Sequence, residues 1–323
     1  MDLTGLPQAA PSRPENKLRY ADVAVTPTAK EFAGIYRGKQ YHEPDFTNTL
    51  DRAWDAGVEK VMLTGMSVTD VSSNLAIAKS RPPNSCFVTM GVHPYNAGEP
   101  GPAGSEYYDK LGQAIRDALA EPVPLIKAYG ELGLDYDRLV HADKETQIAT
   151  FKAQLDMVIK EKWDLPLFLH CRAAFDDFVD IISPYLEKLP RRGLVHSFVG
   201  TRAQMEKLVD LGFDVSVNGF SFQDRESLDM VAAIPLEKLQ IETDAPWGEI
   251  KATSDIAKRY LVNAAPAPLS KKKDKWDPKY MVKERNESNS MEKVALIVAG
   301  LKGISVEQVA NTAWQNSVDM FNL

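Results

Sequence analysis

The sequence predicts an α/β protein whose parallel strands close into a (β/α)₈ barrel, the TIM-barrel architecture. Three observations support this prediction. Short apolar runs alternate with patterns of helical period, about eight such units follow one another, and the chain has 323 residues, enough for a barrel that typically takes about 250. A doubly wound open sheet is the alternative, but no Gly-rich dinucleotide-binding motif follows the first apolar run.

The predicted strands are short and almost entirely apolar. Runs of Val, Ile, Leu, Phe and Met of this length are typical of strands that are buried on both faces of a parallel sheet. In chain order they are Tyr20–Val25, Lys60–Leu63, Cys86–Val92, Leu125–Tyr129, Pro166–Leu169, Gly193–Val195, Phe213–Val217 and Leu239–Ile241.

The predicted helices lie between and after these runs. In residues 146–162, for example, Phe151, Leu155 and Val158 recur at the spacing that brings side chains to one helix face. We expect helices over Thr146–Lys162, Phe175–Leu189, Thr201–Leu211, Met291–Leu301 and Val306–Phe321.

The chain is expected to have one folded domain and two unusual segments. Residues 1–18 are rich in Pro, Ala and polar types, so we expect a disordered leader that is no secretory signal. Residues 19–323 form the predicted single barrel domain. Residues of about 252–290 form a long basic loop with several Pro and little apolar periodicity, and segments of this kind are usually functional or disordered.

Composition excludes several classes of protein. Hydrophobic residues make up 44% and charged residues 26%, which indicates a folded globular chain. No apolar run reaches the roughly 18–20 residues of a membrane span, and two cysteines cannot build a disulfide framework. We expect an intracellular protein of the cytoplasm or nucleus, with a mitochondrial location left open. The net charge of −7 argues against binding nucleic acid by the overall field, but leaves a local basic groove open.

Polar side chains gather where predicted strands end. His93, His170 and His196 end three strands, and Glu131 and Asp244 follow two others. Because the carboxyl ends of barrel strands meet at one face, these side chains are expected to share one site. Imidazole and carboxylate groups bind Zn²⁺, Mn²⁺ or Mg²⁺, and a pair of ions can activate water for phosphodiester cleavage.

Each of these residues also has a purely structural interpretation. A single strand-end histidine is more often structural than a ligand, and a carboxylate there can cap the next helix or turn. The joint pattern of Glu131, His170, His196 and Asp244 on four strands favours a metal site. We expect His42 and His141 at the surface, and Cys171 turned away from the site by strand alternation.

Ordered motifs add a resemblance to a known family. The stretches Gly91–Pro94, Gly130–Asp135, Leu169–Arg172, Val195–Phe198 and Glu242–Trp247 resemble, in the same order, the motifs of the TatD family of metal-dependent DNases. The resemblance extends from about Arg19 to the C-terminus. The stretches Phe32–His42, Asp135–Arg138 and Arg285–Glu287 are similar to the eukaryotic branch of that family.

The resemblance implies a metal-dependent TIM-barrel hydrolase that cleaves DNA, often as a 3′→5′ exonuclease. Carried over by position, Glu131 is the carboxylate shared between ions, and His170 and His196 hold one ion. Asp244 binds the other ion and accepts the proton of the attacking water. Glu131 and Asp244 are therefore the expected catalytic residues.

The same resemblance and the local chemistry predict contacts to the substrate. His93 and Arg172 are expected near a phosphate, while Trp247 either stacks on a base or packs under its loop. The run Lys271, Lys272 and Lys273, continued by Lys275, Lys279, Lys283 and Arg285, is a candidate for contact with the nucleic-acid backbone. Its alternative is a solvated loop.

One departure from the family affects the metal site. Many members carry two histidines on the first strand, where this chain has Ala24 and Thr26. We therefore expect one firm site and one completed by added Mg²⁺ or Mn²⁺, because hard ions tolerate sparse protein ligation better than Zn²⁺. One or two divalent ions per chain are expected, with Zn²⁺ as the alternative.

Three functions follow from these observations. The first is a metal-dependent deoxyribonuclease that acts on DNA as a monomer, with no organic cofactor and no membrane. The second is a barrel hydrolase that cleaves a C–N or ester bond of a small molecule. The third is a metal-poor barrel that binds a partner without catalysis.

Overall fold

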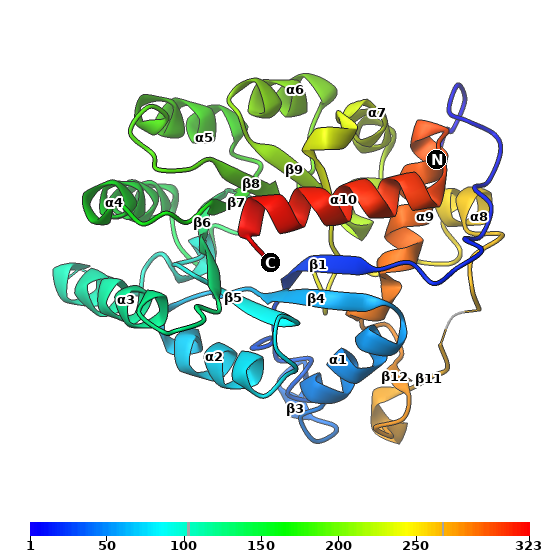
Figure 1. The fold of residues 1–323 in the computed structure, drawn as a ribbon, viewed down its shortest axis with the longest axis horizontal. Coiled ribbons are helices and arrows are strands. Elements are labelled where there is room, and N and C mark those ends of the chain that lie inside the picture. The colour runs from blue at the N-terminus through cyan, green and yellow to red at the C-terminus, as the bar shows by residue number, and fades with distance from the viewer. Residues whose placement is uncertain (102–103, 267) are drawn as a thin grey trace. The chain divides into compact units, whose positions relative to one another are not determined.

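The structure is a computed structural model that describes residues 1–101, 104–266 and 268–323. Eight strands form one sheet in the order β1-β4-β5-β6-β7-β8-β9-β10 (Figure 1). The pairs from β5 to β9 are parallel, and after β10 a parallel bridge joins Ala245 back to Val25 of β1. This strand order, with its return to the first strand, is that of a TIM barrel, and the predicted fold class is confirmed.

All eight predicted strands are present. Their bounds are β1 Tyr20–Val25, β4 Val58–Leu63, β5 Cys86–Met90, β6 Ile126–Asp135, β7 Leu167–Arg172, β8 Gly193–His196, β9 Asp214–Val217 and β10 Leu239–Ile241. Two short pairs accompany them: β2 Ile35–Tyr36 with β3 Lys39–Gln40, and β11 Ser270–Lys271 with β12 Met281–Val282.

Strand β6 is twice as long as predicted, because it continues through two glycines. Gly130 and Gly133 both have positive φ, of 148° and 147°. A Cβ at Gly130 would lie 2.1 Å from the Phe168 carbonyl oxygen, and one at Gly133 would lie 1.9 Å from that of His170. These glycines therefore let β6 approach β7 closely instead of ending the strand.

The helices agree with the expected ones and add several more. They are α1 Phe46–Asp55, α2 Val71–Lys79, α3 Gly104–Leu119, α4 Lys144–Glu161, α5 Phe175–Ile182, α6 Arg202–Asp210, α7 Arg225–Ala233, α8 Asp255–Tyr260, α9 Met291–Lys302 and α10 Val306–Phe321. The five predicted helices are all present. Helix α5 ends before Pro184, which lies in the 3₁₀ turn Ser183–Tyr185.

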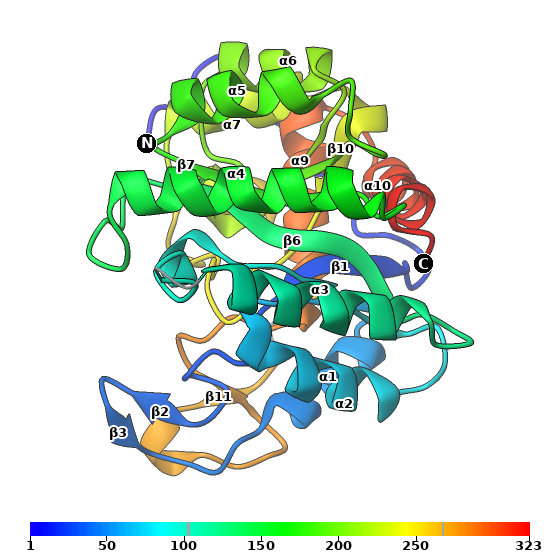
Figure 2. The same cartoon turned by 90° about the vertical axis from the view of Figure 1, so that its left-hand side faces the viewer.

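Two compact units make up the chain. The first contains residues 1–61, 199–205 and 217–317, and the second contains residues 62–198, 206–216 and 318–323. In the second unit, β6 runs between α3 and α4 (Figure 2). There Phe151 of α4 stacks on Phe178 of α5 with ring centroids 5.5 Å apart.

Residues 1–18, expected to be a disordered leader, make specific contacts within the first unit. Leu3 and Leu6 are buried. The Leu3 carbonyl oxygen accepts a hydrogen bond from Arg259 Nη1 at 2.8 Å, and that of Pro7 accepts one from the Tyr260 hydroxyl at 2.7 Å. The structure thus places this segment against α8.

The long basic loop contains more structure than expected, although residue 267 lies outside the described part. It holds α8 and the parallel pair of β11 and β12. Two predictions about its neighbourhood are wrong. His42 is buried, because it stacks on Trp276 at 5.2 Å. Arg285 is also buried, because both its Nη atoms bind the Asp45 carboxylate, at 2.7 and 2.8 Å.

Among the described residues, no single helix has the length and apolar character to cross a bilayer. Only the pair Ser288–Lys302 and Val306–Phe321, bent by 113°, passes the test of length and composition when taken together.

Candidate metal centre

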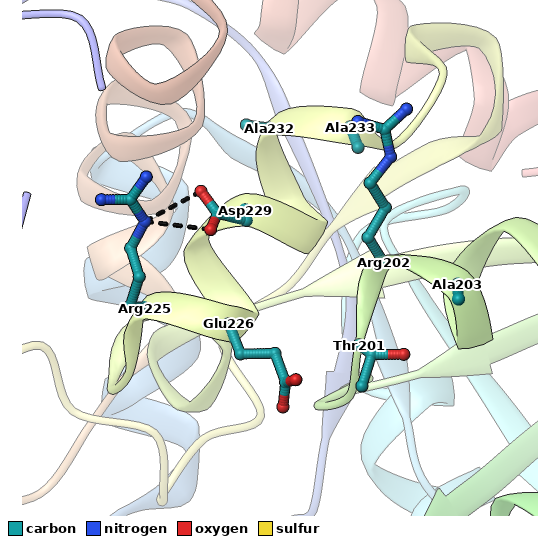
Figure 3. Close-up of a pocket in the computed structure, with 8 residues that line it drawn as sticks. All are labelled: Thr201, Arg202, Ala203, Arg225, Glu226, Asp229, Ala232 and Ala233. Atoms are coloured by element: carbon teal, nitrogen blue, oxygen red, sulfur yellow. Dashed lines mark hydrogen bonds and ion pairs between the residues drawn. The ribbon is translucent and has the colours of Figure 1, made fainter. Parts of the chain in front are cut away.

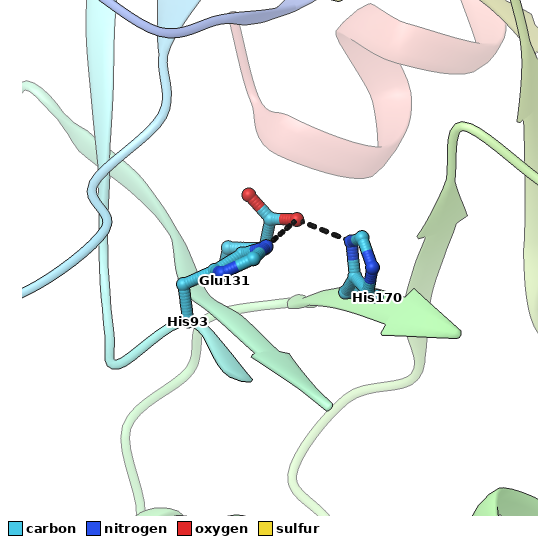
Figure 4. Close-up of side chains that lie close together, drawn as sticks. All are labelled: His93, Glu131 and His170. Atoms are coloured by element: carbon cyan, nitrogen blue, oxygen red, sulfur yellow. Dashed lines mark hydrogen bonds and ion pairs between the residues drawn. The ribbon is translucent and has the colours of Figure 1, made fainter. Parts of the chain in front are cut away.

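Three imidazoles converge on one carboxylate oxygen in the second unit. His93 follows β5, Glu131 lies in β6, His170 in β7 and His196 ends β8. Glu131 Oε1 lies 2.5 Å from His196 Nε2, 2.8 Å from His170 Nδ1 and 3.3 Å from His93 Nε2. Figure 4 shows His93 and His170 directed at this oxygen from opposite sides. All four side chains are almost fully buried.

Strand register brings these groups together. His170 and His196 are paired residues of β7 and β8. In β6, Gly130 pairs with Phe168 and Leu132 pairs with Leu169, so Glu131 is the extra residue of a bulge. Bulges redirect a side chain, and Glu131 donates its N–H to the Gly65 carbonyl oxygen at 3.2 Å. The prediction that Glu131 comes after the strand is therefore wrong, because it lies within it.

Asp135 belongs to this cluster and was missed in the sequence analysis. Its Oδ2 lies 2.9 Å from His170 Nε2, and its side chain is fully buried. Gln147 of α4 fixes the main chain of Asp135: its Oε1 accepts from the N–H at 2.7 Å, and its Nε2 donates to the carbonyl oxygen at 2.8 Å. A signal was present, because residues 131 and 135 share one face of a strand once β6 is extended.

His170 lies between two carboxylates, one on each ring nitrogen. Burial lowers its pKa, but the hydrogen bonds to Asp135 and Glu131 outweigh burial and raise the pKa above its usual value. Metal-binding histidines commonly hold a carboxylate on the ring nitrogen that does not face the ion. Asp135 takes that place here, so Nδ1 is the nitrogen that can accept a cation instead of a proton.

Glu131 remains ionised despite its burial. Burial raises its pKa, but His196 and His93 more than offset this effect, and the pKa lies well below its ordinary value. The pKa of Asp135 is also lowered, since its hydrogen bond to His170 outweighs the effect of burial. Buried carboxylates that stay charged suit a divalent cation.

His93 has a different protonation pattern from His170. Burial lowers its pKa, which favours the neutral ring. Its Nδ1 accepts the backbone N–H of Tyr95 at 3.0 Å, so the single ring proton lies on Nε2. The donor atoms of His93, Glu131 and His170 lie within 4.8 Å of one another, close enough to hold a metal. His93 Nε2 faces Glu131 Oε1 at 3.3 Å, and the role expected for His93 is that of a hydrogen-bond donor near a phosphate.

The predicted ligand Asp244 belongs to the first unit, in a turn that other residues fix. Asp22 of β1 accepts from the Thr243 N–H at 2.9 Å and from its hydroxyl at 2.5 Å. Asn286 Nδ2 donates to the carbonyl oxygens of Thr243, at 3.0 Å, and Trp247, at 2.7 Å. Asp244 itself has a positive φ of 55°. Its distance from the histidine cluster stays a prediction.

The remaining predicted site residues have varied surroundings. Trp247 is 39% exposed, and its role stays a prediction. Arg172 ends β7 and helps to lower the pKa of Asp135. Ala24 and Thr26 are buried in and after β1, where no imidazole is present. In the lysine run, Lys271 forms an ion pair with Asp277 at 2.9 Å, and Lys273 lies over tyrosine rings. Lys272 is exposed.

A separate hollow of about 820 Å³ lies between the start of α6 and α7 (Figure 3). Arg225 and Asp229 line it and bind each other, with Arg225 Nε 2.9 and 3.0 Å from the two carboxylate oxygens. Its lining contains no histidine or cysteine. This hollow therefore lacks the imidazole groups that distinguish the histidine cluster.

A TIM barrel that gathers buried histidines and carboxylates at its strand ends is typical of metal-dependent hydrolases. Within that class, the chain belongs to the family described as TatD related DNase, which residues 22–322 match. The resemblance found in the sequence motifs is thus confirmed.

Individual relatives span almost the whole chain. Deoxyribonuclease Tat-D of Schizosaccharomyces pombe is 39% identical over 311 residues, which cover 94% of this chain and 96% of that protein. The 3′-5′ ssDNA/RNA exonuclease TatD of Erwinia billingiae is 29% identical over 94% of this chain and 98% of that protein. A solved Saccharomyces cerevisiae structure, described as an uncharacterized amidohydrolase, has a TM-score of 0.85 and 32% identity, and covers 94% of this chain and 100% of that one.

Proposed function

We propose that the chain is a metal-dependent deoxyribonuclease that hydrolyses DNA phosphodiester bonds, as a 3′→5′ exonuclease. The observation that carries the proposal is a buried hydrogen-bonded cluster. In it, Asp135 contacts one ring nitrogen of His170, and Glu131 contacts the other ring nitrogen of His170 and a ring nitrogen of His196. The names of the fission-yeast and Erwinia relatives support a nucleic-acid substrate.

The residues present fit a divalent metal. Glu131, His170 and His196 would hold one ion, and Glu131 and Asp244 would hold a second, with Mg²⁺ or Mn²⁺ favoured over Zn²⁺ because Ala24 and Thr26 offer no imidazole. Bound ions of this kind supply Lewis acidity and lower the pKa of water, which makes it a nucleophile at neutral pH.

The chain's own groups have distinct roles in this proposal. His93 Nε2–H donates to a phosphate oxygen, since its tautomer directs a proton into the cluster. Asp135 holds the His170 ring, and Asp244 accepts the proton of the attacking water. Arg172 binds phosphate through its planar guanidinium.

The test is digestion of a 5′-labelled single-stranded oligonucleotide by the purified full-length protein with Mn²⁺ or Mg²⁺. A ladder that shortens from the 3′ end, abolished by EDTA and by Asp244→Asn, is expected. Glu131→Gln is expected to reduce the rate at least about 100-fold, because it removes the central charge of the site. Activity that persists in EDTA, or in both variants, would contradict the proposal.

A hydrolase of small-molecule C–N or ester bonds is the second candidate, favoured by the description of the budding-yeast structure as an amidohydrolase. The same preparation, tested on a panel of amide and ester substrates, separates the two. If the protein cleaves an amide or ester substrate in a chelator-sensitive way and leaves the oligonucleotide intact, the small-molecule hydrolase is the correct function.

We also propose that the active species is a monomer inside the cell, in the cytoplasm or nucleus. The two buried thiols support a reducing compartment. Light scattering after size exclusion tests the monomer, and microscopy of a tagged chain tests the compartment.

A further inference from the structure

Two segments far apart in the sequence meet in the first unit. The β2–β3 hairpin lies beside the strand β11 and the turn that follows it (Figure 2). Lys273 Nζ lies 4.8 Å from the ring centroid of Tyr36 and 4.9 Å from that of Tyr41. The two rings pack edge to face, with centroids 5.9 Å apart. A lysine of the basic loop is thus held by aromatic rings of the hairpin.

The hairpin itself supplies a second ammonium group, that of Lys39, to the Tyr41 ring. Lys39 Nζ lies 5.2 Å from the Tyr41 centroid, and Tyr41 is 36% exposed. Contacts within about 6 Å of a centroid are cation–π interactions, which hold an ammonium group in place while it keeps hydrogen-bonding capacity for an anion. We define the lysine–tyrosine platform by its five members: Tyr36, Lys39, Tyr41, Lys272 and Lys273.

Buried contacts fix the base of this platform. Trp276 stacks on His42 with an interplanar angle of 7°, and its Nε1 donates to Asp45 Oδ2 at 3.1 Å. Asp45 is held in turn by both Nη atoms of Arg285. The platform is therefore preorganised, which reduces the entropy lost when it binds a ligand.

The local charge contrasts with that of the whole chain. Residues 36–42 and 271–276 contain six lysines or arginines and one acidic residue, Asp274, in a chain of net charge −7. Of these lysines, Lys271 is neutralised by Asp277 at 2.9 Å. A positive patch with an exposed aromatic ring complements a ligand that carries both phosphates and flat bases.

We infer that the lysine–tyrosine platform is an accessory site for single-stranded nucleic acid. Lys272 and Lys273 neutralise backbone phosphates. When Lys39 turns from the Tyr41 ring to a further phosphate, the ring face that it covers stacks on an unpaired base. A duplex offers phosphates but keeps its bases stacked inside, so the single strand binds more tightly. The inference extends the proposed nuclease function to a second contact with the same substrate, but binding here requires neither metal nor hydrolysis.

The experiment measures binding apart from catalysis. Fluorescence anisotropy of a labelled oligothymidylate is recorded with full-length protein in EDTA, where hydrolysis is blocked. Lys39→Ala/Lys273→Ala is compared with the charge-matched control Lys152→Ala/Lys160→Ala, which alters exposed residues of α4. We expect the platform variant to bind at least about 5-fold more weakly, and the magnitude of its salt slope to fall by roughly 1.4, about 0.7 per lost phosphate contact. The control should match the wild type.

A second pair of variants tests stacking. Tyr41→Ala should weaken single-strand binding, while Tyr41→Phe should preserve it, because phenylalanine keeps the ring. If Lys273→Ala perturbs folding, as judged by its melting temperature, Lys39→Ala/Lys272→Ala replaces it, since both of these side chains are exposed.

Three results would overturn the inference: equal binding by the platform and control variants, equal loss in Tyr41→Ala and Tyr41→Phe, or a polyglutamate probe that binds as tightly as the oligonucleotide. The last result would indicate an acidic protein partner instead. Failure of the proposed nuclease function is distinguishable, because the anisotropy assay does not depend on cleavage.

Discussion

At the scale of single residues, Asp135 extends the proposed metal site beyond its expected ligands. Its carboxylate binds His170 Nε2 and thereby selects Nδ1 as the nitrogen that faces Glu131. Losing such an orienting carboxylate typically reduces metal affinity 10- to 100-fold, an effect of about 1.4–2.7 kcal/mol. An effect of this size makes Asp135 testable as a positioning residue of the proposed site.

We predict that Asp135→Asn binds Mn²⁺ about 10- to 100-fold more weakly than the wild type. The amide cannot hold the His170 ring as the carboxylate does. Titration calorimetry of the metal-free protein measures this, with the exposed Asp137→Asn as the matched control. Unchanged affinity in Asp135→Asn would show that His170 needs no such orientation.

His93 leads to the opposite prediction, with activity lost and metal binding retained. In the proposed site His93 donates from Nε2, so His93→Ala removes a hydrogen-bond donor and leaves the proposed ligands Glu131 and His170 in place. Loss of one donor that stabilises transition-state charge costs about 10²–10³ in kcat. Steady-state kinetics and metal analysis of the same preparation test this, with the exposed His141→Ala as control. Loss of bound metal in His93→Ala would make it a ligand instead.

At the scale of elements, the buried Arg285 network joins two loops of the first unit. Arg285 binds Asp45 ahead of α1 and Glu287 near the end of the basic loop, and Glu287 also binds Arg52 Nε at 2.7 Å. Breaking a buried ion pair from one side leaves a charge that cannot be solvated. Arg285 therefore has a structural role, although the sequence analysis placed it at the end of a basic run that could contact nucleic acid.

We predict that Arg285→Met lowers the free energy of unfolding by about 3–5 kcal/mol, the usual cost of removing one partner from a buried pair. Urea unfolding followed by circular dichroism measures the change. Lys283→Met, which alters an exposed residue two positions earlier, should change stability little. A loss below about 1 kcal/mol in Arg285→Met would mean that Asp45 and Glu287 gain water or other partners.

The same element scale shows what patterns predict well. Strands β1 and β10 and helix α10 have the predicted bounds. Apolar residues dominate the two strands, although Asp22 and Gln240 lie within them, and polar residues flank both. Strand β6 extends past its predicted apolar run through two glycines, residues that usually weaken a strand. Only the close approach of β7 explains those glycines, and that approach is not visible in one sequence.

At the scale of the whole molecule, the free energy of unfolding depends on pH through Lys302, a lysine that packs against the end of α7. Burial lowers the pKa of Lys302 to about 8, although Glu237 acts in the opposite direction. Its Nζ donates to the carbonyl oxygens of Ala232, at 3.1 Å, and of Ile234. In the unfolded chain this amine has a pKa of about 10.4.

We predict that this group makes the protein more stable as pH rises from about 8 to 10.4. In that range the unfolded state binds more protons than the folded state, so the slope of unfolding free energy against pH is positive. Lys302→Met should remove this contribution. As pH rises, the free energy of unfolding of the wild type should therefore increase relative to that of the variant. Urea unfolding at several pH values measures it, with Lys160→Met as control. If the free energy of unfolding changes with pH in the same way for the wild type and Lys302→Met, the lowered pKa of Lys302 is contradicted.

By itself, the sequence determined the barrel, the order of its elements and the family, and it indicated the histidines and carboxylates near the strand ends that we propose as metal ligands. Apolar periodicity and strand-end chemistry are local, so each can be read within a few residues. Tertiary structure alone decided that Asp135 orients His170, that His93 carries its proton on Nε2, that Arg285 is buried and that Lys273 lies over the hairpin's tyrosines. These properties depend on which groups approach across strands and loops far apart in the chain, and hydrogen bonding and desolvation act only through that proximity.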